Sequence, residues 1–186
     1  MQKITHQQLL DWLKKEVKLS LGCTEPIAIA YAAAVAAKYL NAPILKITGN
    51  ISENLYKNAM GVTIPGTSYC GVTLAAAIGA IGGNADADLE VLKDITATQI
   101  TEAYIFNESG NVCLNAVDAT DFIFIDITLY SLSDQCRVVI QGSHTNVTEV
   151  YINNIKQILV RDLIAANDSG ERPEFSLNDA CKFVTD

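Results

Sequence analysis

A single cysteine occupies the expected start of a buried helix, in the segment Gly22-Cys23-Thr24-Glu25-Pro26. Proline suits the first turn of a helix, because its missing N–H needs no partner there. The free N–H groups and the dipole at such a helix start favour a thiolate, the form of cysteine that binds metal or attacks carbon. Glu25 works against this by like-charge repulsion. The alternative is that Cys23 is a structural thiol with no reactivity.

A second polar segment, residues 52–67, carries two amides, a lysine and three serine or threonine hydroxyl groups around a loop punctuated by glycine. Backbone N–H groups and asparagine side chains bind small carboxylates, and a lysine adds positive charge. The phosphate-binding pattern GxxxxGK[ST] is absent from this segment, so a nucleotide is not the expected ligand. The alternative is a turn between two helices that needs its glycines and proline for geometry alone.

The third segment, Gly142-Ser-His-Thr-Asn146, falls in the turn between two predicted strands. His144 is one of two histidines, and the other, His6, is expected on the polar side of the first helix. A cysteine–histidine nucleophile would need His144 to be brought to Cys23 by folding. The alternative is an exposed polar hairpin loop.

Together and in this order, the three segments resemble the N-terminal part of the iron–sulfur L-cysteine desulfidase family, which is related to the iron–sulfur L-serine dehydratase α chain. The motifs that carry the resemblance are Leu-Gly-Cys-Thr-Glu-Pro-Ile-Ala, Asn-Leu-Tyr-Lys-Asn-Ala-Met-Gly-Val-Thr-Ile-Pro-Gly-Thr and His-Thr-Asn. The resemblance runs over most of the 186 residues. It implies a lyase that converts L-cysteine to pyruvate, ammonia and sulfide, using a [4Fe–4S] cluster held by three cysteines.

By this resemblance, Cys23 is one cluster ligand, and the other two lie in a later part of the family that this chain lacks. The chain alone is therefore expected to hold no stable cluster and to be inactive. The residues implied to line the substrate pocket are Asn54, Asn58, Thr67, His144 and Asn146. Lys57 and Ser68 are the candidates for the catalytic base, although Ser68 stands where the family pattern has glycine. The remaining cysteines match no family ligand: Cys70, Cys113, Cys136 and Cys181.

The implied chemistry agrees with these residue types. Cysteine thiolates are the usual cluster ligands, and an iron with an open position acts as a Lewis acid that draws off the leaving thiolate while a base removes the α-proton. The same iron could draw off hydroxide, so an L-serine dehydratase-like deaminase is one alternative. A non-catalytic amino-acid-binding module is another.

The amino-acid composition and net charge of the chain limit the classes of partner that we expect for it. Apolar residues make up 49% and charged residues 18% of the chain, which excludes general disorder and allows homo-oligomer contacts. The net charge of −8 argues against nucleic acid and anionic membrane surfaces as partners. Widely spaced cysteines, odd in number, and a polar start without a signal-peptide core predict a cytoplasmic protein with reduced thiols. A small amino acid is the expected substrate.

The pattern of elements predicts an α+β fold with an inserted module. Residues 1–84 are expected to form the helical, glycine-looped beginning of a catalytic domain, with helices at 6–18, 26–40 and 72–81 and a strand at 44–47. Residues 85–165 read as a helix-plus-antiparallel-sheet module, with helices at 86–92 and 96–107 and strands at 112–117, 122–131, 136–141 and 148–152. This module resembles the substrate-sensing domain of serine dehydratases. Residues 166–186 are expected to be a linker and the start of a helix that leads to the missing remainder.

Overall fold

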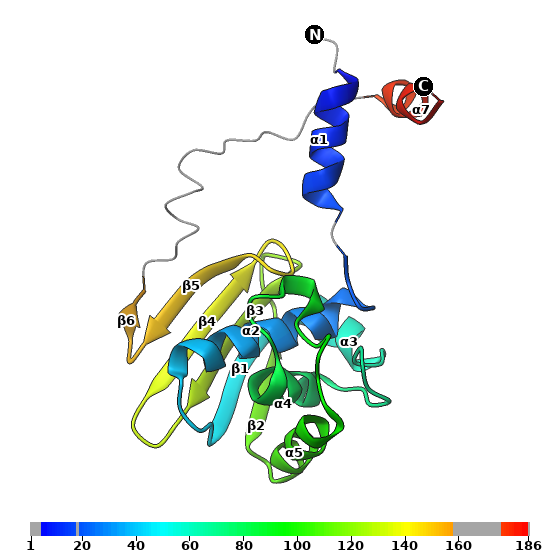
Figure 1. Ribbon diagram of the computed structural model, residues 1–186. Coiled ribbons are helices and arrows are strands. Elements are labelled where there is room, and N and C mark those ends of the chain that lie inside the picture. Colours follow the sequence, from blue (N-terminus) through cyan, green and yellow to red (C-terminus); the bar gives the residue numbers. More distant parts are fainter. Residues whose placement is uncertain (1–4, 18, 158–175, 186) are drawn as a thin grey trace. The chain divides into compact units, whose positions relative to one another are not determined.

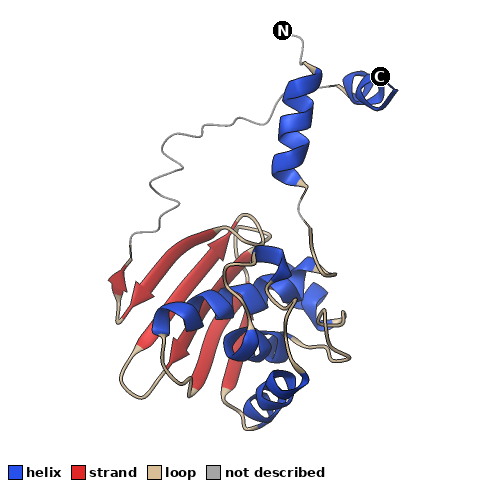
Figure 2. Cartoon of the chain, viewed as in Figure 1, coloured by secondary structure: helices blue, strands red, loops and turns tan. Residues whose placement is uncertain are grey.

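The computed structural model describes residues 5–17, 19–157 and 176–185. Its contacts divide the chain into two compact units, one made of Met1–Leu19 with Val160–Asp186 and the other of Ser20–Leu159. The larger unit is a mixed six-stranded sheet with helices packed on one face (Figures 1 and 2). This arrangement confirms the predicted α+β class.

The sheet runs in the order β2-β1-β3-β4-β5-β6. Only β1 and β2 are parallel neighbours, and every other described pairing is antiparallel. The strands are β1 (Lys46–Ser52), β2 (Val112–Val117), β3 (Phe124–Tyr130), β4 (Gln135–Gln141), β5 (Val147–Ile152) and β6 (Ile155–Lys156). The helices of this unit are α2 (Thr24–Leu40), α3 (Glu53–Met60), α4 (Val72–Gly82) and α5 (Ala97–Glu108), with a 3₁₀ turn, η1, at Asp88–Glu90.

The helix α2 is the centre of the core. Its side chains from Pro26 to Ala36 are all buried, because it packs on β3 and β4 on one side and on α4 on the other. Its many alanines let α4 approach closely: a Cβ placed on Gly79 would lie 2.1 Å from the carbonyl oxygen of Ala30. Small residues at both helices therefore set the distance between them. The outer helix α5 then packs on α4.

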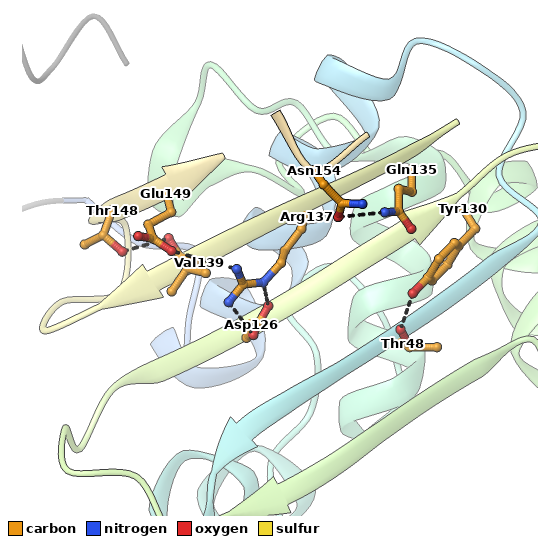
Figure 3. Close-up of polar contacts among 9 residues, drawn as sticks. All are labelled: Thr48, Asp126, Tyr130, Gln135, Arg137, Val139, Thr148, Glu149 and Asn154. Atoms are coloured by element: carbon orange, nitrogen blue, oxygen red, sulfur yellow. Dashed lines mark hydrogen bonds and ion pairs between the residues drawn. The ribbon is translucent and has the colours of Figure 1, made fainter. Parts of the chain in front are cut away.

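The opposite face of the sheet carries polar side chains (Figure 3). Arg137 on β4 donates from Nε and Nη2 to the two carboxylate oxygens of Asp126 on β3, each at 2.8 Å. Glu149 on β5 lies 3.9 Å from the same guanidinium, and Arg137 also lies 5.4 Å from the ring centroid of Tyr151. These contacts run across three adjacent strands and fix their register on this face.

The smaller unit contains α1 (His6–Glu16) and α7 (Leu177–Thr185). Thr5 begins α1 with a capping box, in which its side chain and that of Gln8 each bond the other's backbone. The ring of His6 is exposed, as expected, and its centroid lies 4.5 Å from that of Phe183 on α7. The predicted linker up to residue 175 lies outside the described residues.

The structure differs from the predicted division at residues 84 and 85. Strand β1 precedes that boundary, yet it lies between β2 and β3 in the sheet and pairs with both. Both segments thus contribute to one sheet and one core, and the contacts place them in one unit. Two elements also differ: the helix expected at 86–92 is the short turn η1, and the strand expected at 44–47 runs from Lys46 to Ser52.

Candidate functional site

Cys23 is the residue from which α2 begins. It is partly buried, adopts an extended backbone conformation as the N-cap, and makes no capping hydrogen bond through its side chain. The segment from Gly61 to Thr67, which follows α3, forms a glycine-rich loop. Gly22, which precedes Cys23, lies against this loop, since a Cβ at Gly22 would be 3.1 Å from Cγ of Pro65. The start of α2 and the loop of the second polar segment are therefore neighbours.

Glu25, in the first turn of α2, connects these segments. Its Oε2 accepts a hydrogen bond from Cys23 Sγ at 2.8 Å, and Thr24 Oγ1 lies 3.4 Å from the same oxygen. Its Oε1 accepts from Asn58 Nδ2 on α3 at 3.4 Å. The carboxylate thus joins the cysteine of the first segment to an asparagine of the second.

His144, in the third segment, is influenced electrostatically by the same carboxylate. It lies in the tight loop between β4 and β5, next to the buried Thr145, and its charge and that of Glu25 influence each other's pKa. The His144 side chain is partly buried, and its Nε2 atom is buried without a hydrogen-bond partner. Asn146 shapes the loop, because its Nδ2 donates to the carbonyl of Gln141 at 2.9 Å.

The protonation states of the three groups follow from these contacts. Burial and the hydrogen bond to Glu25 raise the pKa of the Cys23 thiol. The hydrogen bond from Cys23 and that from Asn58 lower the pKa of Glu25, so its carboxylate stays ionised. Burial lowers the pKa of His144, although the nearby Glu25 charge acts in the other direction. Burial and the hydrogen bond to Glu25 oppose the thiolate form of Cys23 more strongly than the helix start favours it, so the pKa of the thiol is raised.

The glycine-rich loop is closed by Thr67. Its Oγ1 donates to the carbonyl of Ile64 at 2.9 Å and accepts from the backbone N–H of Tyr69 at 3.0 Å. Gly66 adopts a positive φ of 83°, which a side chain would make strained, and so permits the tight turn. The Thr67 hydroxyl accordingly shapes the loop, while the adjacent Ser68 is exposed.

The remaining predicted residues lie on α3. Asn54 and Lys57 are both exposed, and Lys57 Nζ forms an ion pair with Glu53 at 3.2 Å, one turn back on the same helix. Asn58 is the residue of this helix that contacts the α2 start. The structure therefore joins Cys23 and Asn58 through Glu25, whose charge also acts on the pKa of His144. Among the described residues, no hydrogen bond or ion pair joins Lys57 or Asn54 to them.

Sequence reasoning assigned Glu25 only an effect on the Cys23 thiol and missed its central place. A glutamate in the first turn of a helix is common, because it is stabilised by the helix dipole, so the signal in the sequence was weak. The convergence of distant segments on Glu25 depends on tertiary structure.

The donor set fits one ligand of a cluster. Cys23 is a partly accessible thiol outside any disulfide, at a helix start whose free N–H groups favour negative charge on sulfur. Because burial and Glu25 raise its pKa, a cluster would have to displace the thiol proton on binding. Within the described residues, no group of three or more histidine, cysteine, aspartate and glutamate side chains could hold a metal ion. None of the five cysteines, all of which lie in the described ranges, forms a disulfide; Cys136 is buried, and burial raises its pKa to about 12.

The chain is 50% identical over 175 residues to a UPF0597 protein of Klebsiella pneumoniae subsp. pneumoniae, covering 94% of this chain and 41% of that protein. A UPF0597 protein of Photobacterium profundum is 44% identical over 146 residues, or 78% of this chain and 34% of its own length. A UPF0597 protein of Shewanella sediminis is 45% identical over 147 residues, which cover 79% of this chain and 35% of that protein. The chain therefore spans about two fifths or less of the length of the curated relatives it matches. No protein-family model matches it, and no solved structure gives a significant match.

Proposed function

We propose that this chain is the N-terminal portion of an amino-acid β-eliminating lyase that uses a [4Fe–4S] cluster to cleave L-cysteine into pyruvate, ammonia and sulfide. The observation that carries the proposal is the hydrogen-bonded link from Cys23 through Glu25 to Asn58, with the Glu25 charge also acting on the pKa of His144. These residues come from three segments that are far apart in the sequence, and each segment holds one of the motifs that resemble the desulfidase family.

In the proposed enzyme, Cys23 holds the cluster by one thiolate, and the part of the protein outside this chain supplies the other ligands. The bound cluster supplies an iron with an open position that acts as a Lewis acid on the sulfur of the substrate. The coverage of the relatives agrees with this division, because well over half of their length lies outside the matched segment. The chain alone is then inactive.

The residues of this chain would bind and orient the amino acid. Asn58 lies at the site, and its side-chain amide can donate hydrogen bonds to a carboxylate. The loop closed by Thr67 and Gly66 lies beside the start of α2, where its backbone N–H groups can add further donors. Lys57 would have to leave its ion pair with Glu53 to act as the base, and Ser68 is the other candidate.

The test uses the full-length protein that contains this chain, purified without oxygen. The expected result is a brown protein that contains iron and acid-labile sulfide and releases sulfide from L-cysteine. Cys23→Ser should lose most of the iron and the activity, since a hydroxyl is a poor cluster ligand. Cys113→Ser, on the polar face of the sheet, is the matched control and should keep both.

Two results would contradict the proposal. One is a colourless full-length protein that does not consume L-cysteine. The other is a Cys23→Ser variant that keeps wild-type iron content and turnover. Comparison of L-cysteine with L-serine in the same assay separates the desulfidase from a serine dehydratase-like deaminase of the same fold.

A non-catalytic amino-acid-binding module is a second candidate. The observation in its favour is the raised pKa of Cys23, because a thiol that holds its proton and donates it to Glu25 is suited to a structural role. Binding of amino acids by a full-length protein that carries no cluster would support this candidate over the lyase.

Three further parts of the proposal concern the setting of the protein. No helix in the described ranges is long and apolar enough to cross a membrane. We place the protein in the cytoplasm, where cysteine thiols stay reduced, with a small amino acid as its partner and with self-association into a homo-oligomer.

A further inference from the structure

The two helices of the smaller unit come from opposite ends of the chain. They contact each other, since the ring centroids of His6 on α1 and Phe183 on α7 lie 4.5 Å apart. α1 has 11 residues and α7 has 9. Helices shorter than about 12–15 residues are marginal in water and depend on the packing of an apolar face. A pair this small buries too little apolar surface to be stable alone, so it needs a further element to pack on.

The exposed side of α7 carries apolar side chains at helical spacing. Leu177 and Val184 lie two turns apart, so they share one side of the helix. Each is 82% exposed, whereas Phe183, which contacts α1, is partly buried. At the end of α1, Val17 is 70% exposed. Single exposed apolar residues are common on protein surfaces, but an apolar pair on one side of a short helix is typical of a face that another element covers.

The length of the relatives favours one occupant for this face, the part of the full-length protein that lies outside this chain. The matched segment covers 41% of the Klebsiella pneumoniae relative, so more than half of that protein lies outside it. In a protein of that length the outer part is joined to this chain by the backbone, and it therefore meets α1 and α7 at the high effective concentration of an intramolecular contact. A second copy of the chain would meet them only at its own, lower concentration.

We propose that α1 and α7 form a docking surface for the part of the full-length protein outside this chain, with Leu177 and Val184 as the apolar contacts. The docked element is an amphipathic helix, because an apolar pair two turns apart fits between the side chains of a second helix. The proposal rests on the proposed function only in taking this chain as the N-terminal portion of a longer protein. Both ends of the chain then belong to one helical domain, into which the unit Ser20–Leu159 is inserted in sequence.

Hydrogen exchange followed by mass spectrometry tests the proposal without any measurement of activity. Amide exchange in the α1 and α7 peptides is compared between the full-length protein and this 186-residue chain. Both helices should exchange roughly tenfold or more slowly in the full-length protein, because the docked part protects their backbone N–H groups. Peptides from the buried helix α2 are the internal control, and they should exchange slowly in both proteins.

Two substitutions in the full-length protein test the apolar contacts themselves. Leu177→Gln and Val184→Gln remove apolar side chains with little loss of helix propensity, since glutamine is a good helix former. Each should raise the exchange rate of α1 and α7 about threefold, and the double variant about tenfold. Leu132→Gln is the matched control, because Leu132 is a 92% exposed apolar residue in the turn between β3 and β4; it should leave the exchange of both helices unchanged. Slow exchange of α2 shows that the larger unit of each variant is folded, and the single variants serve if the double variant does not fold.

The proposal is overturned if α1 and α7 exchange equally fast in the two proteins, or if the glutamine variants exchange like the wild type. Slow exchange of both helices in the 186-residue chain itself also overturns it. A dimer in light scattering would then identify a second copy as the occupant, and a monomer would identify the larger unit. A full-length protein that protects both helices but releases no sulfide from L-cysteine rejects the lyase and keeps the proposal. An active lyase whose α1 and α7 exchange as fast as in this chain alone does the reverse.

Discussion

The side chains around the start of α2 control one another's protonation. Cys23 donates to Glu25, and the same carboxylate lies near His144. Sequence alone indicated the type of residue at each of these positions, since the three motifs were evident. It did not indicate that Glu25 joins them, because that depends on how α2, α3 and the β4–β5 loop pack.

Alkylation of Cys23 should show the effect of Glu25 directly. Burial, together with the hydrogen bond and negative charge of Glu25, raises the pKa of the thiol, so less thiolate is present near neutral pH. Glu25→Gln removes the charge and should shift the pH profile of iodoacetamide labelling to lower pH. Mass spectrometry of the Cys23 peptide provides the measurement, with Glu102→Gln, at an exposed carboxylate on α5, as control. An unchanged profile in Glu25→Gln would contradict this account.

Titration of His144 should make the fold less stable in acid. Because burial lowers the pKa of His144 below its value in the unfolded chain, the unfolded state binds a proton first as the pH falls. The stability is therefore complete above the unfolded pKa of about 6.5 and declines as the pH falls toward the folded pKa. Urea unfolding at pH 7.5 and 5.5 should show a smaller difference for His144→Asn than for wild type. The exposed His6 provides the control substitution, His6→Asn, which should leave the difference unchanged.

At the scale of elements, the packing of α2 on α4 depends on the absence of a side chain at Gly79. An added Cβ would lie 2.1 Å from the Ala30 carbonyl oxygen, so the helices would have to separate. Gly79→Ala should lower the free energy of unfolding by about 1–3 kcal/mol or more, as overpacking does. Gly61→Ala is the matched control, since nothing lies within 4 Å of its Cβ position and its φ is negative; it should change stability little.

The start of α5 offers a second test at this scale. Thr96 and Gln99 form a capping box, with the Thr96 side chain accepting from the Gln99 N–H. Thr96→Ala should cost about 1 kcal/mol in urea unfolding, because the first-turn N–H loses its partner. Thr101 is an exposed residue in the middle of the same helix. Thr101→Ala should leave the free energy of unfolding unchanged or raise it slightly, because alanine has a high helix propensity. Equal losses in the two variants would contradict a capping role for Thr96.

Most helices and strands were predictable because their periodicity and turn residues are local signals. Strands β2 to β5 and helices α2, α4 and α5 lie within a few residues of their expected bounds. The segment after Asn84 was misjudged as a full helix at 86–92, because Asp88 adopts a positive φ that stops helix growth. Strand β1 was expected to be short, since Gly49 and Asn50 weaken a strand signal.

At the scale of the whole molecule, the order of the strands in the sheet could not be predicted from the sequence. Gly49 shows why β1 is central: a Cβ there would lie 2.3 Å from the carbonyl oxygen of Asp126 and 3.1 Å from Leu114 Cδ2, so both neighbours approach this position closely. Strand pairing between residues that are 65 positions or more apart leaves no local pattern. The predicted boundary at residue 84 therefore followed composition and missed the pairing.

Removal of β1 should prevent folding of the sheet. In a fragment of residues 85–157, β2 loses β1, its hydrogen-bonded neighbour, and β3 becomes an edge strand with an uncovered apolar face. This fragment should show no cooperative urea transition by circular dichroism, whereas residues 20–157 should show one. Cooperative unfolding of 85–157 alone would instead support an autonomous module.

The central place of β1 also has a consequence for protein synthesis. Translation delivers α2 and β1 early, but β2 and β3, the two neighbours of β1, come only after residue 111. Until then the nascent chain carries α2, whose residues Pro26 to Ala36 are all buried in the folded protein, without the strands β3 and β4 that cover it, a state that favours aggregation and chaperone binding. The ribosome must therefore extend the chain through Tyr130 before the first three strands can assemble.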